Sequence, residues 1–468
     1  MKNGLMRKKS IESLVASTEN QGLKRELGAF DLTMLGVGAV IGTGIFVLTG
    51  TGAVQAGPAL AISFVIAALA CLFAALAYAE FASTVPISGS VYTYTYATLG
   101  EFFAWIIGWD LILEYLLAVS AVSVGWSGYF QSFLSGIGLD LPKALTAAPG
   151  AVKGATTYMN LPAILIVIAI TFVLSIGIKE SKRLNNMMVL FKIAVVLLFI
   201  IVAIFYVKPA NWVPFMPFGF KGVFSTAALL FFAFVGFDAV ASAAEETKNP
   251  AKDLPKGIIT SLAICAVLYV AVSLIMTGVV PYPAFSQALD RPVALVLQMA
   301  GQNWVAGVIS VGAVFGMTTV MLVMLYGQTR IMYAMARDGL MPPFLSKIHK
   351  KYKTPYGATW IFGLIAAGLG GFVPLDELAS LVNIGTLSAF TLISVAVLVL
   401  RKTRPDLKRA FTCPGVPVVP ALAILFCLFL MVQLSGATWI RFLIWLAIGM
   451  VIYFFYSRKN SKLNKQGK

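Results

Sequence analysis

Twelve long apolar runs constrain the fold of this chain more than any other feature. Each has about 20 residues, the length that an α-helix needs to cross the hydrocarbon core of a bilayer. Lipid offers the backbone no hydrogen-bond partners, so such runs are expected to cross as helices. The sequence therefore predicts an all-α integral membrane protein with twelve transmembrane helices, at residues 29–55, 58–83, 101–130, 160–178, 187–207, 222–244, 257–280, 303–336, 357–373, 377–400, 418–434 and 438–456.

Composition excludes several classes of protein. With 59% hydrophobic and only 12% charged residues, the chain is too apolar for a soluble globular protein. Residues 1–27 are polar and basic, so no cleavable signal peptide is expected. The four cysteines form no CxxC pair and the single histidine, His349, lies in a basic loop, so we expect no metal site, no disulfide framework and no cofactor.

The distribution of basic residues predicts the topology. With the N-terminus inside, 28 lysines and arginines fall on the cytoplasmic side of the twelve spans and six on the opposite side. This bias follows the positive-inside rule and places both termini in the cytoplasm of a multi-pass cell-membrane protein. Topology and anionic lipid headgroups then explain the net charge of +16, and a nucleic-acid partner is not expected.

The first span contains glycines where a membrane helix should be continuous. Gly42 and Gly44 flank Thr43 near its middle and would allow the helix to unwind. Unwound backbone is tolerated in a membrane only where it lines a buried cavity. Its freed N–H groups would attract a carboxylate and its freed carbonyls an ammonium, so one segment could hold a zwitterion. Close packing of small residues is an equal alternative on this segment alone.

The sixth span repeats this pattern. Residues 231–238 place Gly236 and the carboxylate of Asp238 inside an aromatic-rich membrane segment. The first and sixth spans occupy equivalent positions if spans 1–5 and 6–10 are two halves. Interrupted helices at matching positions of two halves indicate a substrate site at their interface.

Ionisable residues inside spans are expensive and are expected to face the interior of the bundle. Asp110 and Glu114 lie one helical turn apart on the third span, and Lys192 lies near the start of the fifth. For Lys192 the alternative is that its side chain snorkels to the cytoplasmic interface. For Asp110 we favour a structural role over substrate contact, and for Glu114 both roles stay open.

Three separated motifs carry a family resemblance. The sequence resembles the amino acid–polyamine–organocation (APC) superfamily, and within it the bacterial cationic amino acid transporter group. The similarity covers about residues 25–456. The motifs are Gly42–Phe46; Pro86–Tyr94 with Gly100-Glu101, Gly108-Trp109 and Glu114-Tyr115; and Phe234–Asp238 with Ala244–Pro250 and Asp253-Leu254-Pro255.

The resemblance implies a fold and a division of the chain. The fold is the leucine-transporter type, an inverted 5+5 repeat of helices with two further helices at the C-terminus. The division is a cytoplasmic segment at 1–28, two five-helix repeats at 29–207 and 208–402, helices 11 and 12 at 403–456, and a cytoplasmic tail at 457–468.

The resemblance also implies roles for particular residues. The substrate α-carboxylate would meet the backbone of Ile41, Gly42, Thr43 and Gly44. The α-ammonium would meet carbonyls near Phe231, Ala233 and Phe234, and Phe234 or a neighbouring aromatic residue would act as a lid. Lys192 matches a lysine that takes the place of a sodium ion in proton-coupled members, and Glu114 and Asp238 are assigned with it to coupling or gating.

Met321 on the eighth span departs from what a carrier of arginine or lysine needs, because it could cap the pocket and favour short side chains. An ordinary gap-filling methionine is the alternative. We expect a secondary active transporter, proton-coupled, for small neutral or cationic L-amino acids, with no catalytic residues. An amino acid exchanger, a polyamine carrier and, more distantly, an intramembrane enzyme or a channel are the competing functions. The sequence does not indicate whether an accessory protein is present.

Overall fold

The computed structural model describes residues 7–9, 25–84, 90–152, 154, 156–177, 182–407 and 409–466. Within these ranges the protein is helical, and the extended pairs are the two isolated bridges Leu27–Thr247 and Thr146–Asn160. Part of the second predicted motif, residues 86–89, lies outside the described residues. The predicted all-α class is confirmed.

The helices follow the apolar runs closely. Among the residues that the structure describes, eight helical segments are long and apolar enough to cross a membrane, and four shorter apolar helices accompany them. The main helices are α2 (Ala29–Val40), α3 (Thr49–Ala56), α4 (Leu60–Thr84), α5 (Ser90–Thr98), α6 (Glu101–Gly136), α7 (Leu161–Ser175), α8 (Lys182–Ala203), α9 (Gly219–Leu230), α10 (Ala239–Ser242), α11 (Pro250–Val279), α12 (Pro292–Met299), α13 (Asn303–Arg337), α14 (Tyr356–Phe372), α15 (Leu375–Thr403), α16 (Val418–Gln433), α17 (Gly436–Ile452), α18 (Arg458–Asn460) and α19 (Lys462–Gln466).

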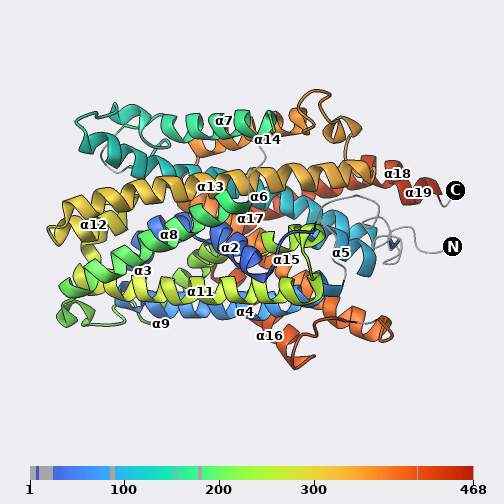
Figure 1. Ribbon diagram of the computed structural model, residues 1–468, viewed down its shortest axis with the longest axis horizontal. Coiled ribbons are helices and arrows are strands. Elements are labelled where there is room, and N and C mark those ends of the chain that lie inside the picture. The colour runs from blue at the N-terminus through green and yellow to red at the C-terminus, as the bar shows by residue number, and fades with distance from the viewer. Residues whose placement is uncertain are drawn as a thin grey trace.

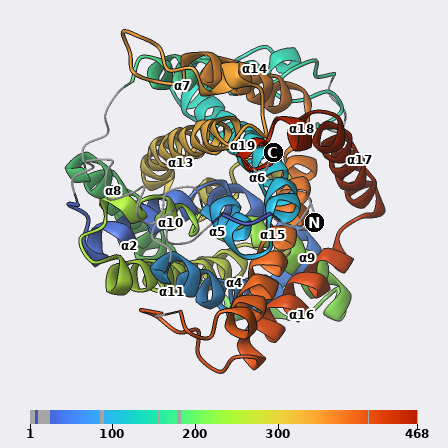
Figure 2. The same ribbon diagram turned by 90° about the vertical axis from the view of Figure 1, so that its right-hand side faces the viewer.

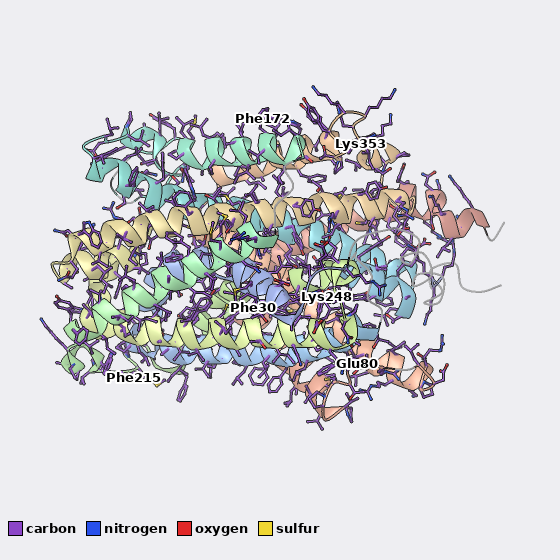
Figure 3. The ribbon with its side chains drawn as sticks, in the orientation of Figure 1. Phe30, Glu80, Phe172, Phe215, Lys248 and Lys353 are labelled. Carbon is purple, nitrogen blue, oxygen red and sulfur yellow. The ribbon has the colours of Figure 1, made fainter. Side chains whose placement is uncertain are left out.

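The long helices run side by side along one axis (Figure 1). α13 packs on α6, and α11 packs on both α4 and α2. Figure 2, seen along that axis, places α7 and α14 on one flank and α16 on the other. Large apolar side chains such as Phe172, Ile201 and Ile444 are exposed on the outside of the bundle, and Phe172 lies at its periphery (Figure 3). This is the surface of a multi-pass membrane protein, whose outer face meets lipid.

Small residues let the inner helices approach closely. α4 buries Ala67, Ala70, Ala74 and Ala77 completely, at the spacing of one helix face, and that helix packs against α11. Without a hydrophobic driving force between helices in lipid, such close van der Waals packing stabilises their association.

Two ends of the bundle can be distinguished. At one end, here called the terminal end, Lys9 forms a 2.6 Å ion pair with Asp338, and Ser461 donates a 2.5 Å hydrogen bond to Glu101. Segments from both ends of the chain therefore meet beside α5, α6 and α13. The other end, here called the distal end, carries α12, on the left of Figure 1.

Candidate functional site

The first membrane segment is broken between α2 and a short π-helix, η1 (Gly44–Leu48). α2 stays helical to Val40, and Ile41 then adopts an extended backbone with φ −73° and ψ 101°. The break is therefore shorter than the glycine pattern suggests. Gly38, like Gly36, serves packing, because a Cβ on Gly38 would lie 2.6 Å from Val189.

The carbonyls freed by this break are met by side chains from distant helices. The Lys192 ammonium on α8 donates to the Gly38 carbonyl at 2.7 Å and to that of Ile41 at 3.4 Å. The Tyr269 hydroxyl on α11 donates to the Val40 carbonyl at 2.9 Å. A cation at a helix C-terminus also offsets the negative end of the helix dipole. Lys192 is 1% exposed, so its ammonium points into the bundle and does not snorkel to the interface.

The start of η1 presents backbone N–H groups to the broken region. The first N–H groups of any helix lack an intrahelical acceptor. Here these groups belong to the segment that begins at Gly42, and Phe46 N–H already donates to the Gly42 carbonyl at 3.2 Å. Carbonyls that accept from Lys192 and the first amides of η1 thus lie within a few residues of each other.

The sixth membrane segment breaks beside the first. α9 continues as a 3₁₀ helix, η6 (Phe231–Phe234), and the chain then unwinds until α10 begins at Ala239. Gly236 has φ +117°, a conformation that favours glycine. A Cβ on Gly44 would lie 2.3 Å from the Ala233 Cα, so the two broken segments are in direct backbone contact.

The C-terminal end of η6 presents backbone carbonyls, whereas the start of η1 presents backbone amides. The last C=O groups of η6 lack intrahelical donors, as at any helix C-terminus. One turn earlier, the Asn383 amide on α15 donates to the carbonyls of Ala228 at 2.7 Å and Leu229 at 2.9 Å. Phe234 packs edge-on against Phe64 and tilted against Tyr269, which fixes the ring over the broken region.

One face of α13 covers both breaks with apolar side chains. The Thr43 hydroxyl donates to the Met317 sulfur at 3.3 Å. A Cβ on Gly42 would lie 3.1 Å from Val320, and one on Gly236 would lie 3.0 Å from the Met324 methyl group. Met321 lies one turn beyond Met317 on this face and is fully buried. The side-chain end of any ligand held here would meet hydrocarbon and sulfur.

Carboxylates gather on the terminal side of the second break. Asp238 directly precedes α10, and the Tyr115 hydroxyl donates to its carboxylate at 3.2 Å. Glu114 lies near both Asp238 and Thr386. Both carboxylate oxygens of Asp110, one turn away on α6, are buried without a hydrogen-bond partner. Glu114 and Asp238 are thus brought together, whereas Lys192 lies at the other break.

The predicted site residues form one buried region. The side chains of Ile41, Thr43, Phe231, Ala233, Phe234 and Met321 are at most 1% exposed, and Gly42 and Gly44 are buried with them. The site is closed from both ends in this conformation. Among the described residues, no cluster of His, Cys, Asp and Glu could hold a metal ion.

Tyr269 and Asn383 donate to the carbonyls of the broken segments from other helices, and neither was predicted from the sequence. Neither carries a charge, so the rule that singles out ionisable residues in spans does not find them. Glu80, an acidic residue within the second predicted span, was not predicted either, although that rule does identify it.

Comparison with known proteins shows the family of this chain. The amino acid permease family model matches residues 27–456. The chain is 74% identical over 466 residues to the branched-chain amino acid permease BcaP of Bacillus subtilis, covering 99% of this chain and all of that protein. It is 57% identical to the methylthioribose transporter of B. subtilis, covering 99% of this chain and all of that one. It is 37% identical to BcaP of Lactococcus lactis, covering 98% and 100% of the two chains.

Proposed function

The chain belongs to the amino acid permease family, and from this premise we propose that it is a proton-coupled symporter of branched-chain L-amino acids in the cell membrane. Membership makes it a transporter and not an enzyme. The substrate class is carried over from two relatives whose names state it, one of them 74% identical. The inverted repeat, its domain boundaries and cytoplasmic termini remain part of the proposal.

The observation that carries the proposal is the contact between the two broken segments. In the proposed complex the amides of Gly42, Thr43 and Gly44 receive the α-carboxylate, and carbonyls near Phe231, Ala233 and Phe234 receive the α-ammonium. The contact of Gly44 with Ala233 brings these two sets of groups together. Oppositely polarised helix ends at one point suit a zwitterion.

The apolar face of α13 supports a branched aliphatic side chain over a basic one. The residues of that face that contact the breaks are Met317, Val320 and Met324, and none carries a charge. An arginine or lysine side chain placed there would bury its charge without a partner, which is costly. This extends the expectation that Met321 limits the pocket.

Proton coupling is proposed from two sites. Lys192 would hold the carbonyls of the first break while it is charged and release them on losing its proton. Glu114 and Asp238 are the buried carboxyls on the terminal side of the second break. Intramembrane ionisable groups of this kind mark proton paths in transporters.

A thermal-shift panel tests the substrate. The purified protein is heated with each of the twenty L-amino acids, and leucine, isoleucine and valine should raise Tm most, because a ligand of the folded state stabilises it by mass action. Two controls keep the side chain but remove one charge, 4-methylpentanoate without the ammonium and 3-methylbutylamine without the carboxylate. Neither should raise Tm. A panel in which no amino acid raises Tm would contradict the proposal.

A second candidate is transport of methylthioribose, favoured by the relative that is 57% identical. That uncharged thiosugar lacks both ends of the zwitterion but would suit the methionine-lined face. It belongs in the same panel. A shift with methylthioribose and none with leucine would favour this second function.

A further inference from the structure

A buried tyrosine on α6 forms a hydrogen bond to the broken first segment at the distal side of the site. The Tyr129 hydroxyl donates to the Phe46 carbonyl, in the middle of η1, at 2.7 Å. Its ring meets the Phe46 ring edge-on, with centroids 6.0 Å apart. Tyr129 is 0% exposed and belongs to none of the motifs described above.

The same hydroxyl reaches a second element. The backbone amides of Val293 and Ala294, in the first turn of α12, lie close to the Tyr129 oxygen. One phenol thus lies where three parts of the chain meet: α6, the distal half of the first segment, and the helix α12 at the distal end. A π-helix such as η1 is often found at functional sites, where its wider turn alters the usual backbone pairing.

Glycines bring α6 close enough for this contact. A Cβ on Gly125 would lie 2.7 Å from the Thr43 methyl group and 3.0 Å from Val47. A Cβ on Gly128 would lie 2.8 Å from Asp290, which precedes α12. The face of α6 from Gly125 to Tyr129 therefore contacts both neighbours without intervening side chains.

We propose that Tyr129 is a positioning residue that holds the distal side of the site closed, so that the site opens distally only when its hydrogen bond to Phe46 breaks. This inference rests on the proposed transport by alternating access. Opening on that side requires η1 to move away from α6. The Tyr129 hydroxyl makes a polar contact between these two elements, through its hydrogen bond to the Phe46 carbonyl. Its loss should raise the distally open population about fivefold, the factor expected for one net hydrogen bond.

Accessibility of a reporter thiol tests the proposal. Val47 is 2% exposed and faces Gly125, so a Val47→Cys thiol becomes reachable only when η1 separates from α6. Labelling of purified V47C by a charged maleimide is compared with V47C/Y129F, after subtracting the rate of the parent chain. We expect labelling about fivefold faster in the double variant. Equal rates would overturn the proposal.

A matched control makes the same chemical change elsewhere. Tyr453 is also buried and donates to Glu101 at 3.3 Å at the terminal end. V47C/Y453F should label at the V47C rate. Acceleration by both substitutions would indicate general loosening and contradict the specific role of Tyr129.

Two further arms separate this inference from the proposed function. If V47C/Y129F does not fold, V47C/G125A serves instead, because the added methyl group would lie 2.7 Å from the Thr43 methyl group and pushes the first segment away from α6; an unchanged rate in it would count against the proposal. Saturating leucine should slow V47C labelling by favouring the closed state. Leucine protection with equal labelling of V47C and V47C/Y129F would contradict the role of Tyr129 alone. Fast labelling of V47C/Y129F with no leucine effect in either chain would support the role of Tyr129 and contradict the proposed substrate.

Discussion

At the scale of single residues, the contact between Gly44 and Ala233 decides how the two broken segments meet. A methyl group on Gly44 would lie 2.3 Å from a backbone atom that cannot move by side-chain rotation. The same contact serves packing and, in our proposal, brings the carboxylate and ammonium sites together. The glycines can therefore serve both close helix packing and ligand binding, and the two interpretations do not exclude each other.

Gly44→Ala should abolish the thermal shift given by leucine. The substitution separates the breaks, so a zwitterion can no longer reach both sets of backbone groups. Gly368→Ala on α14 is the control, because its Cβ would meet nothing within 4 Å. Retained leucine binding in a folded G44A protein, with an unchanged apparent affinity, would refute the placement of the carboxylate.

Met321→Ser should change side-chain selection. The substitution removes apolar bulk and adds a hydroxyl group, so arginine should gain relative to alanine by about 1–3 kcal/mol, the usual scale for one such pocket contact. Competition binding of the two amino acids measures the ratio of affinities. The control is Met299→Ser, at a residue that is 53% exposed on α12. An unchanged ratio in M321S would place Met321 outside the pocket.

At the scale of helices, a buried acidic residue joins α4 to the end of α15. Glu80 accepts from both Nε and Nη2 of Arg401, at 2.9 and 2.8 Å, and lies 3.1 Å from Arg409. It also accepts the Cys413 backbone N–H at 2.8 Å. Figure 3 places Glu80 where α4 meets the segment after α15.

Glu80→Gln should destabilise the protein strongly. Removing one partner of a buried ion pair leaves an uncompensated charge, at a cost of about 3–5 kcal/mol. The control is Glu377→Gln, since the pair of Glu377 with Arg441 is about 40% exposed on both sides and should cost about 1 kcal/mol or less. Chemical or thermal unfolding of the two variants checks the order. Equal losses of stability would show that the buried ion pairs of Glu80 with Arg401 and Arg409 contribute no more to stability than a surface pair.

The reactivity of the Cys413 thiol, and its dependence on pH, report on the same contact between α4 and the end of α15. Burial and the nearby Glu80 carboxylate raise the pKa of its thiol to about 11, against an opposing effect of Arg401. The thiolate is the reactive form, so in a chain that keeps only this cysteine maleimide labelling should be slow at neutral pH and rise about tenfold per pH unit below that pKa. Glu80→Gln should accelerate labelling at constant pH. A pH-independent rate in the parent chain would contradict this account.

How much the sequence could predict differs between helices and contacts. The bounds of α6, α13 and α14 agree within a few residues with the apolar runs, except that α6 continues to Gly136, because span length and hydrophobicity are local properties. The break near Gly42 was also predictable, from the positions of Gly42 and Gly44 inside an apolar run. Its partners were not, because the hydrogen bond from Tyr269 to Val40 joins residues 229 positions apart. Only the folded chain brings such residues together.

At the scale of the whole molecule, segments from both ends of the chain share one end of the bundle, and the site lies buried in its interior. Lys192 from α8 holds the carbonyls of the first break, and Glu114 and Asp238 lie beside the second. The closed arrangement thus places proposed proton sites against both broken segments. Exchange of protons at these sites would then bias which end opens, which is the central claim of this account.

Uptake of labelled leucine into proteoliposomes tests that claim most directly. With sodium absent and the outside acidic, the native protein should accumulate leucine above equilibrium, and dissipating the pH gradient with a protonophore should end the accumulation. Lys192→Ala, which removes the 2.7 Å contact with Gly38, should lose the response to the gradient. Full dependence on sodium, or normal proton-driven accumulation by folded K192A, would contradict the account.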